Sequence, residues 1–163
     1  MKRALLLVSA CLLALEAQAT TFYVIVAGLG GEPDYEQRFT TAANDLGRIF
    51  KSAGATARVY TCVGTLATAA RFRDTINTIA RDARADDDFV LILIGHGSFD
   101  GVEYKFNLPG PDVTAAEIAA MCDRVASRRR ACGTCSAPPK MSRRRPGRPG
   151  RCRRPAHSAA AAS

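Results

Sequence analysis

A histidine follows the most apolar run downstream of residue 20 and has a glycine on each side. The run is FVLILI at 89–94, and Gly95, His96 and Gly97 come directly after it. Imidazole is the side chain best suited to accept and donate a proton near neutral pH. Glycine permits close approach, and the N–H of Gly97 could face a developing oxyanion. These residues predict an acid–base site at His96 with Gly97 as a backbone oxyanion donor.

Two cysteines follow this histidine at a separation that a Cys–His dyad could use. Cys132 and Cys135 lie 36 and 39 residues after His96. A nucleophilic thiol must be held beside its base by a packed element. The segment 128–135, RRRACGTC, holds no apolar residue larger than Ala and Cys. Cys135 is the better candidate for the nucleophile, but we expect this segment to leave its thiol unplaced.

The same cysteines belong to a pattern with the outline of a zinc site. Cys132, Cys135, Cys152 and His157 form C-x2-C-x16-C-x4-H. No apolar residues surround the pattern, and ten arginines and one lysine between positions 128 and 154 would repel a divalent cation. The glycine-rich turn after residue 27 also lacks the third glycine of a dinucleotide-binding fingerprint. We therefore expect neither a metal nor a cofactor.

The remaining cysteines of the folded segment are Cys62 and Cys122, which fall on a predicted strand and a predicted helix. Both are interpreted as small buried hydrophobic residues. In an oxidising compartment, a disulfide could join them to each other or to the later cysteines, but the spacing assigns no pair.

Alternating strands and helices must position these residues. In chain order we expect a strand at 22–26, a helix at 34–53 with Asp34 as its N-cap, a strand at 55–62, a helix at 69–83, a strand at 89–94, an extended excursion or hairpin at 99–108 and a helix that begins at a capping box of Thr114 and Glu117. This alternation predicts an α/β fold with a mainly parallel, open sheet. His96 then lies at the carboxyl edge of the sheet, where such folds bind ligands.

The next element should be a fourth strand, and the sequence does not show one. Residues 128–163 contain no Phe, Tyr, Val, Ile or Leu, and 25 of them are Arg, Ala, Pro or Gly. Such a stretch cannot bury enough apolar surface to fold, so we expect a folded domain at 20–127 and a disordered tail at 128–163. The abrupt change to residues with GC-rich codons favours a shifted reading frame or an artificial end.

Charge is divided unevenly along the chain, whose formal net charge is +8. Residues 20–123 hold 9 basic and 14 acidic side chains, whereas residues 124–163 hold 12 basic and no acidic ones. A polybasic tail can bind nucleic acid or an anionic membrane surface. A non-enzymatic binding module with such a tail is therefore the alternative hypothesis for function.

The first 19 residues have the pattern of a secretory signal. Two basic residues precede an apolar stretch at 4–15, and the small residues at 17 and 19 form a cleavage site. The stretch is too short to remain as a membrane span. We expect export to the periplasm or the exterior, and we rank lipoprotein anchoring at Cys11 second.

The folded segment resembles the caspase-like cysteine peptidases, particularly the legumain-like branch. The resemblance rests on FYVIVAGLGG at 22–31, AANDLGRIF at 42–50, FVLILIGHGSFDG at 89–101 and TAAEIAA at 114–120. It implies strand order 2-1-3-4, with the catalytic His after the third strand and the nucleophilic Cys after the fourth. By this resemblance the thiolate attacks the scissile peptide carbonyl, the histidine handles the proton on the leaving amine and Gly97 donates to the oxyanion.

The absence of a fourth strand would limit what this resemblance implies. We expect a caspase-like sheet of order 2-1-3 only, with no placed nucleophile and hence no measurable cleavage of peptide or protein substrates. The outer edge of the strand at 89–94 would then be unpaired and would associate with other chains.

Overall fold

The computed structural model describes residues 18–135. The predicted signal segment at 1–17 with Cys11, and the tail at 136–163 with Cys152 and His157, lie outside the described residues. The elements in chain order are β1 (Thr21–Ala27), α2 (Pro33–Lys51), β2 (Ala57–Cys62), a short 3-10 turn (Gly64–Leu66), α3 (Ala69–Asp82), β3 (Asp88–Ile94), β4 (Gly97–Phe99), β5 (Tyr104–Phe106), β6 (Val113–Thr114), α4 (Ala115–Asp123) and β7 (Arg129–Cys135). Within the described part of the chain, no helix is long and apolar enough to cross a membrane.

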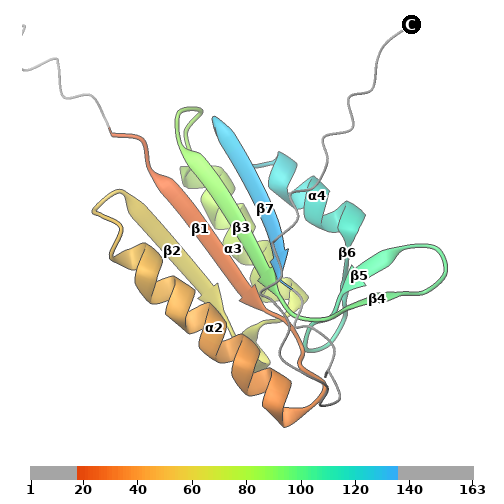
Figure 1. Cartoon of the computed structure of the whole chain (residues 1–163). Helices are drawn as coiled ribbons and strands as arrows, with labels where there is room; N and C mark the ends of the chain where they lie inside the picture. Colours follow the sequence, from red (N-terminus) through yellow and green to blue (C-terminus); the bar gives the residue numbers. More distant parts are fainter. Residues whose placement is uncertain (1–17, 136–163) are drawn as a thin grey trace, which may run out of the picture.

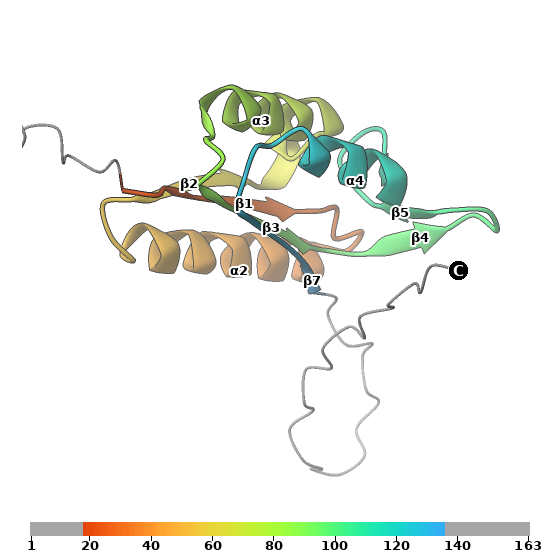
Figure 2. The same ribbon diagram turned by 90° about the horizontal axis from the view of Figure 1, so that it is seen from above.

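A parallel sheet with strand order β2-β1-β3-β7 forms the centre of the molecule. Helix α2 covers one face, and α3 and α4 lie on the other (Figure 1, Figure 2). A small antiparallel sheet of order β4-β5-β6 extends beyond the carboxyl end of β3. The predicted α/β fold with an open, mainly parallel sheet and the order 2-1-3 is confirmed.

The core consists of two apolar layers, one on each face of this sheet. Alternate residues of a strand point to opposite faces, so β3 sends Leu91 into the layer under α3 and α4, and Ile94 into the layer under α2. Both faces of β3 are covered, which explains why its sequence is apolar almost throughout. The side chains of Phe72 and Ile76 from α3 are completely buried.

The fourth strand is present, contrary to the prediction that it is missing. Strand β7 runs parallel to β3, with Arg129 opposite Asp88 and Cys135 opposite Ile94. The expectation of disorder from residue 128 onward is therefore wrong for 129–135. The outer edge of β3 is paired along its length, so the predicted exposed edge on that strand is also wrong.

Charged residues anchor the start of β7. Arg129 donates to both carboxylate oxygens of Asp88, at 3.2 and 2.8 Å, and Arg128 lies 3.5 Å from the same carboxylate. Arg130 donates to the carboxylate of Asp123, at the end of α4, at 2.8 Å. An edge strand has one unpaired side and needs less apolar surface than a central strand. Ladder hydrogen bonds and ion pairs can thus hold a segment that apolar content alone predicts to be disordered.

The helix starts agree with the sequence in one case and differ in another. Thr114 Oγ1 accepts a hydrogen bond from the Glu117 N–H at 3.1 Å, and the Glu117 carboxylate accepts one from the Thr114 N–H at 2.9 Å, which confirms the capping box. Helix α2 instead has Glu32 as its N-cap and Pro33 in its first turn, so Asp34 is inside the helix. Proline is favoured there because its fixed φ suits the first turn.

Candidate active site

His96 lies two residues beyond the end of β3, at the carboxyl edge of the sheet. Its imidazole packs edge-on against the rings of Tyr35 and Phe39 from α2, with centroids 5.0 and 5.1 Å away. Phe39 is buried, whereas His96 is half-buried. The two aromatic rings therefore restrict the orientation of the imidazole, and His96 remains partly accessible to solvent.

Backbone hydrogen bonds fix the chain around His96. The N–H of Asn107 donates to the His96 carbonyl at 3.1 Å, and the Asn107 carbonyl accepts from the Leu29 N–H at 2.8 Å. The N–H of Gly28 donates to the carbonyl of Ile94 at 2.8 Å. These bonds connect the ends of β1, β3 and β5, so the edge that carries His96 is held by three elements.

Packing requires the glycine before His96. A β-carbon at Gly95 would lie 2.9 Å from the ring of Phe106 and 3.2 Å from the Cα of Gly28, both shorter than ordinary van der Waals contact. Phe106 is buried. The absence of a side chain at Gly95 thus lets β5 cross close to the ends of β1 and β3, a structural role that the sequence pattern did not reveal.

The backbone N–H of Gly97, the predicted oxyanion donor, lies outside the hydrogen bonds between β4 and β5. Gly97 pairs with Phe106 in the antiparallel ladder of β4 and β5. Along an antiparallel ladder, hydrogen-bonded and non-hydrogen-bonded residue pairs alternate. The neighbouring pair is hydrogen-bonded, because the N–H of Asn107 donates to the carbonyl of His96. The Gly97–Phe106 pair is therefore a non-hydrogen-bonded one. The Gly97 N–H therefore points away from β5, and the residue is exposed.

A pocket of about 320 Å³ opens beside these residues. It is lined by His96 and its two glycines, by residues of β5, by the start of α4 and by Thr134 of β7. Apolar wall atoms come from Leu93, Phe106 and Ile118. A wider hollow of about 510 Å³ on the outer face of α2 has no cysteine or histidine in its lining, so the chemistry favours the smaller pocket.

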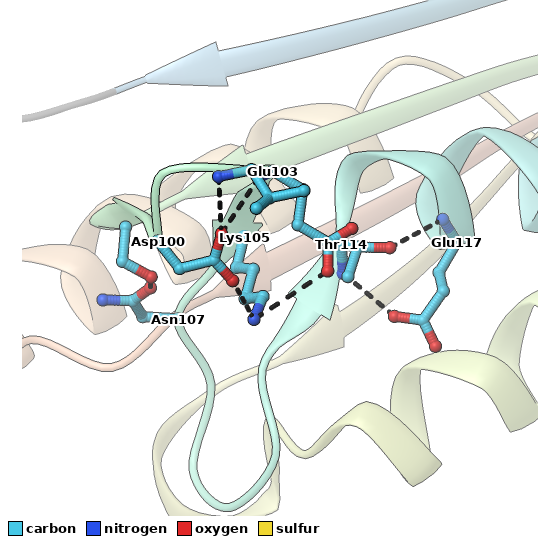
Figure 3. A network of polar contacts seen from close by, with 8 residues as sticks. Asp100, Glu103, Lys105, Asn107, Thr114 and Glu117 are labelled. Carbon is cyan, nitrogen blue, oxygen red and sulfur yellow. Dashed lines mark hydrogen bonds and ion pairs between the residues drawn. The ribbon is translucent and has the colours of Figure 1, made fainter.

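Lys105 lines the same pocket and is paired with the turn between β4 and β5 (Figure 3). Its Nζ lies 2.7 Å from Asp100 Oδ2 and 3.8 Å from Glu103 Oε1. Asp100 Oδ1 accepts hydrogen bonds from the N–H groups of Val102 and Glu103, both at 3.0 Å. The Lys105 contact and these N–H groups hold the pKa of the Asp100 carboxyl far below its usual value, and Asp100 in turn raises the pKa of Lys105. The lysine therefore stays charged at neutral pH.

The structure brings Cys135 to the edge that carries His96. The Cα of Cys135 pairs with that of Ile94, two residues before His96, and Thr134 pairs with Leu93. Adjacent strands lie about 4.8 Å apart, so the two proposed reactive residues belong to neighbouring strand ends. Cys132 pairs further back along β3, away from this edge. The expected lack of any ordered element around Cys135 is corrected by β7.

Sequence reasoning predicted a site at His96, Gly97 and Cys135 but not the residues that pack around it. Tyr35 and Phe39 were predicted only as part of the apolar face of a helix, and periodicity alone cannot show that its first two turns contact the histidine. Among residues 18–135, no group of three or more His, Cys, Asp or Glu side chains could hold a metal ion.

Comparisons with known proteins give a structural likeness only. No protein-family model and no curated protein matches this chain. Its structure is similar to the crystal structure of protein GSU0716 from Geobacter sulfurreducens, with a TM-score of 0.54 and 19% sequence identity. The match covers 72% of this chain and 50% of that chain, so this chain spans about half the length of the protein it matches. At this identity the likeness shows a shared α/β fold.

Proposed function

We propose that this chain is a caspase-like cysteine endopeptidase in which His96 and Cys135 form the catalytic dyad. The observation that carries the proposal is the register of β3 and β7, which ends both strands at one edge with Cys135 opposite Ile94. The legumain-like resemblance supports it, because that family has its histidine after the third strand of the sheet and its cysteine after the fourth.

In the proposed reaction, each residue at the edge has one role. The Cys135 thiolate attacks the carbonyl carbon of the scissile peptide bond, and the oxyanion that forms accepts a hydrogen bond from the Gly97 N–H. His96 gives a proton to the leaving amine and then takes one from the water that hydrolyses the thioester. The pocket beside His96, with its apolar walls and Lys105, would hold part of the substrate peptide.

The expectation of an inactive chain rested on an unplaced thiol. Residues 129–135 pair with β3, and this pairing supports a position for the proposed nucleophile near the proposed base. Correct orientation of two reacting groups can contribute roughly 7–11 kcal/mol in the best intramolecular cases. We expect a nucleophile on a paired strand to retain more of this contribution than one on a disordered tail.

The proposal includes export, since the N-terminal residues have the pattern of a secretory signal.

The alternative hypothesis is a binding module with a polybasic tail. Arg128 and Arg129 share the carboxylate of Asp88, and Arg130 pairs with Asp123, so these three cations already have partners within the fold. Binding through the tail should weaken steeply as salt rises and should vanish when residues 136–163 are deleted, whereas peptidase turnover should survive the deletion.

Turnover of a peptide library under reducing conditions tests the proposed function. Cys135→Ser should abolish turnover, and His96→Ala should lower it by about 100-fold or more. Cys132→Ser is the matched control, because Cys132 is on the same strand but away from the edge. Absence of turnover by the unaltered chain, or turnover that survives Cys135→Ser, would overturn the proposal.

A further inference from the structure

Two cysteines outside the proposed dyad face the same apolar layer from neighbouring elements. Cys132 of β7 is opposite Leu91 of β3, and paired residues of parallel strands project to the same face of a sheet. Leu91 belongs to the layer under α3 and α4. Cys122, in the last turn of α4, packs against this layer. Both cysteines are thus on the α4 side of the sheet.

Contacts on either side of Cys132 locate it more closely. Residues 130, 132 and 134 share one face of β7 because strand side chains alternate. Arg130 reaches Asp123 at the end of α4, and Thr134 lines a pocket with Ile118 near the start of that helix. Residue 132 therefore faces the part of α4 between positions 118 and 123, and Cys122 is in that interval.

The electrostatic contact between the two thiols agrees with this placement. Burial is the main cause that raises the pKa of the Cys122 thiol to about 11, and the proximity of Cys132 is the second. Both cysteines are free thiols in this structure. Cys132 is exposed as a residue, although atoms packed around its sulfur raise its pKa as well.

We propose that Cys122 and Cys132 are a redox pair whose disulfide fastens β7 to α4. The cross-link would connect the middle of the strand that ends at Cys135 to the helix beside it. It would therefore restrain the strand that carries the proposed nucleophile, a consequence that rests on the proposed function, whereas the cross-link itself does not.

The bond can form by exchange with a small disulfide such as oxidised glutathione. The thiolate of Cys132, the more exposed of the two, attacks one glutathione sulfur and releases one glutathione thiol. Cys122 then loses its proton to water, attacks the Cys132 sulfur and releases the second glutathione. Two protein thiols are oxidised and one glutathione disulfide is reduced to two thiols.

Peptide mapping of the full folded chain tests the proposal. The protein is incubated with oxidised glutathione, alkylated and digested with trypsin without reduction. Cleavage after Lys105, Arg124, Arg130 and Lys140 gives peptides 106–124 and 131–140. We expect these two peptides to be joined, and to stay joined in Cys135→Ser, which removes the other cysteine of the second peptide.

The matched controls are Cys122→Ser and Cys132→Ser, each of which should yield no joined peptide. The thermal midpoint of the oxidised protein should exceed that of the reduced protein by several degrees, with no such difference in either control. Alkylation of both thiols after oxidation, a bond between Cys132 and Cys135, or joined peptides found only in covalent dimers would overturn the proposal. None of these outcomes depends on peptidase activity.

Discussion

At the scale of single residues, the best-supported feature is how the imidazole of His96 is held. It contacts Tyr35 and Phe39 on α2, and hydrogen bonds of the adjacent backbone fix the loop that carries it. In the proposed reaction such a ring would need little reorganisation, because packing restricts its orientation beforehand.

Phe39→Leu should lower kcat by about 2–10-fold, since an edge-on aromatic contact contributes roughly 0.5–1.5 kcal/mol. KM should change little, because Phe39 is buried below the histidine and does not line the pocket. Phe72→Leu is the matched control: it alters a buried phenylalanine of α3, in the apolar layer on the other face of the sheet. Steady-state kinetics of both variants check this, and an equal loss of kcat in the two would contradict a positioning role for Phe39.

Gly95→Ala should destabilise the fold by about 1–3 kcal/mol, because its β-carbon would be forced against Phe106 and the backbone of Gly28. Gly133→Ala is the control on β7, since a β-carbon there meets nothing within 4 Å. Denaturant unfolding measures both free energies. A Gly95→Ala variant as stable as the unaltered chain would show that the close approach is not required.

The sequence allowed His96, Gly97 and Cys135 to be proposed because each follows from local pattern and residue type. It did not reveal why Gly95 is a glycine, nor that Phe39 contacts the histidine. Both depend on which elements meet at the sheet edge, and neither periodicity nor spacing contains that information.

At the scale of elements, β7 shows where reasoning from apolar content fails. Strands β1 and β3 were predicted from their runs of large apolar residues, as central strands should be. Strand β7 is at the edge, and Asp88 and Asp123 supply partners for its arginines. Asp88 is far from residues 128–130 in the sequence, and Asp123 is on another element, α4. The ion pairs can therefore be recognised only in the folded structure.

Asp88→Asn should loosen the start of β7, because it removes the charge that binds Arg129 and Arg128. Hydrogen bonding to Arg129 is the main cause that lowers the pKa of the Asp88 carboxyl in the folded protein. Because the pKa of Asp88 is lower in the folded chain than its unfolded value of about 3.9, the ionised carboxylate stabilises the attachment of β7 at pH values above about 3.9. This stabilisation is lost as the pH falls through the lower, folded-state pKa, where the carboxylate takes up a proton. In the unaltered chain, β7 should therefore lose protection only below about pH 4.

Amide hydrogen exchange at 129–135, corrected for intrinsic rates, measures this effect. The Asp88→Asn variant should show reduced protection at pH 7 and little further change in acid. Asp45→Asn is the control, since Asp45 pairs with Arg48 on α2, remote from β7. Unchanged protection of β7 in Asp88→Asn would show that the ladder alone holds the strand.

At the scale of the whole molecule, β7 determines which sheet edge faces solvent. The alternation of strands and helices predicted the α/β class and the order 2-1-3, which the structure confirms. With β7 in place, the apolar strand β3 is paired on both sides and has no free edge that could pair with a strand of another chain. The shifted-frame interpretation of the tail stays a prediction, because β7 accounts for 129–135 only and residues 136–163 lie outside the described part.

A mature chain that ends at residue 135 should be monomeric, whereas one that ends at residue 127 should associate. The shorter variant lacks β7 and exposes the backbone groups and large side chains of β3. Sedimentation velocity over a range of concentrations measures the difference. A monodisperse shorter variant would contradict the protective role of β7.

The most direct test of the central claim is site-resolved labelling of the reduced, full-length protein with a peptidyl electrophile that mimics a scissile bond. The account predicts stoichiometric modification of Cys135, identified in peptide 131–140 by mass spectrometry, with competition by substrate peptides and loss of the rapid reaction in His96→Ala. Equal labelling of Cys132 and Cys135 at a rate indifferent to His96→Ala would show two ordinary surface thiols, and would contradict a Cys135–His96 dyad at this edge of the sheet.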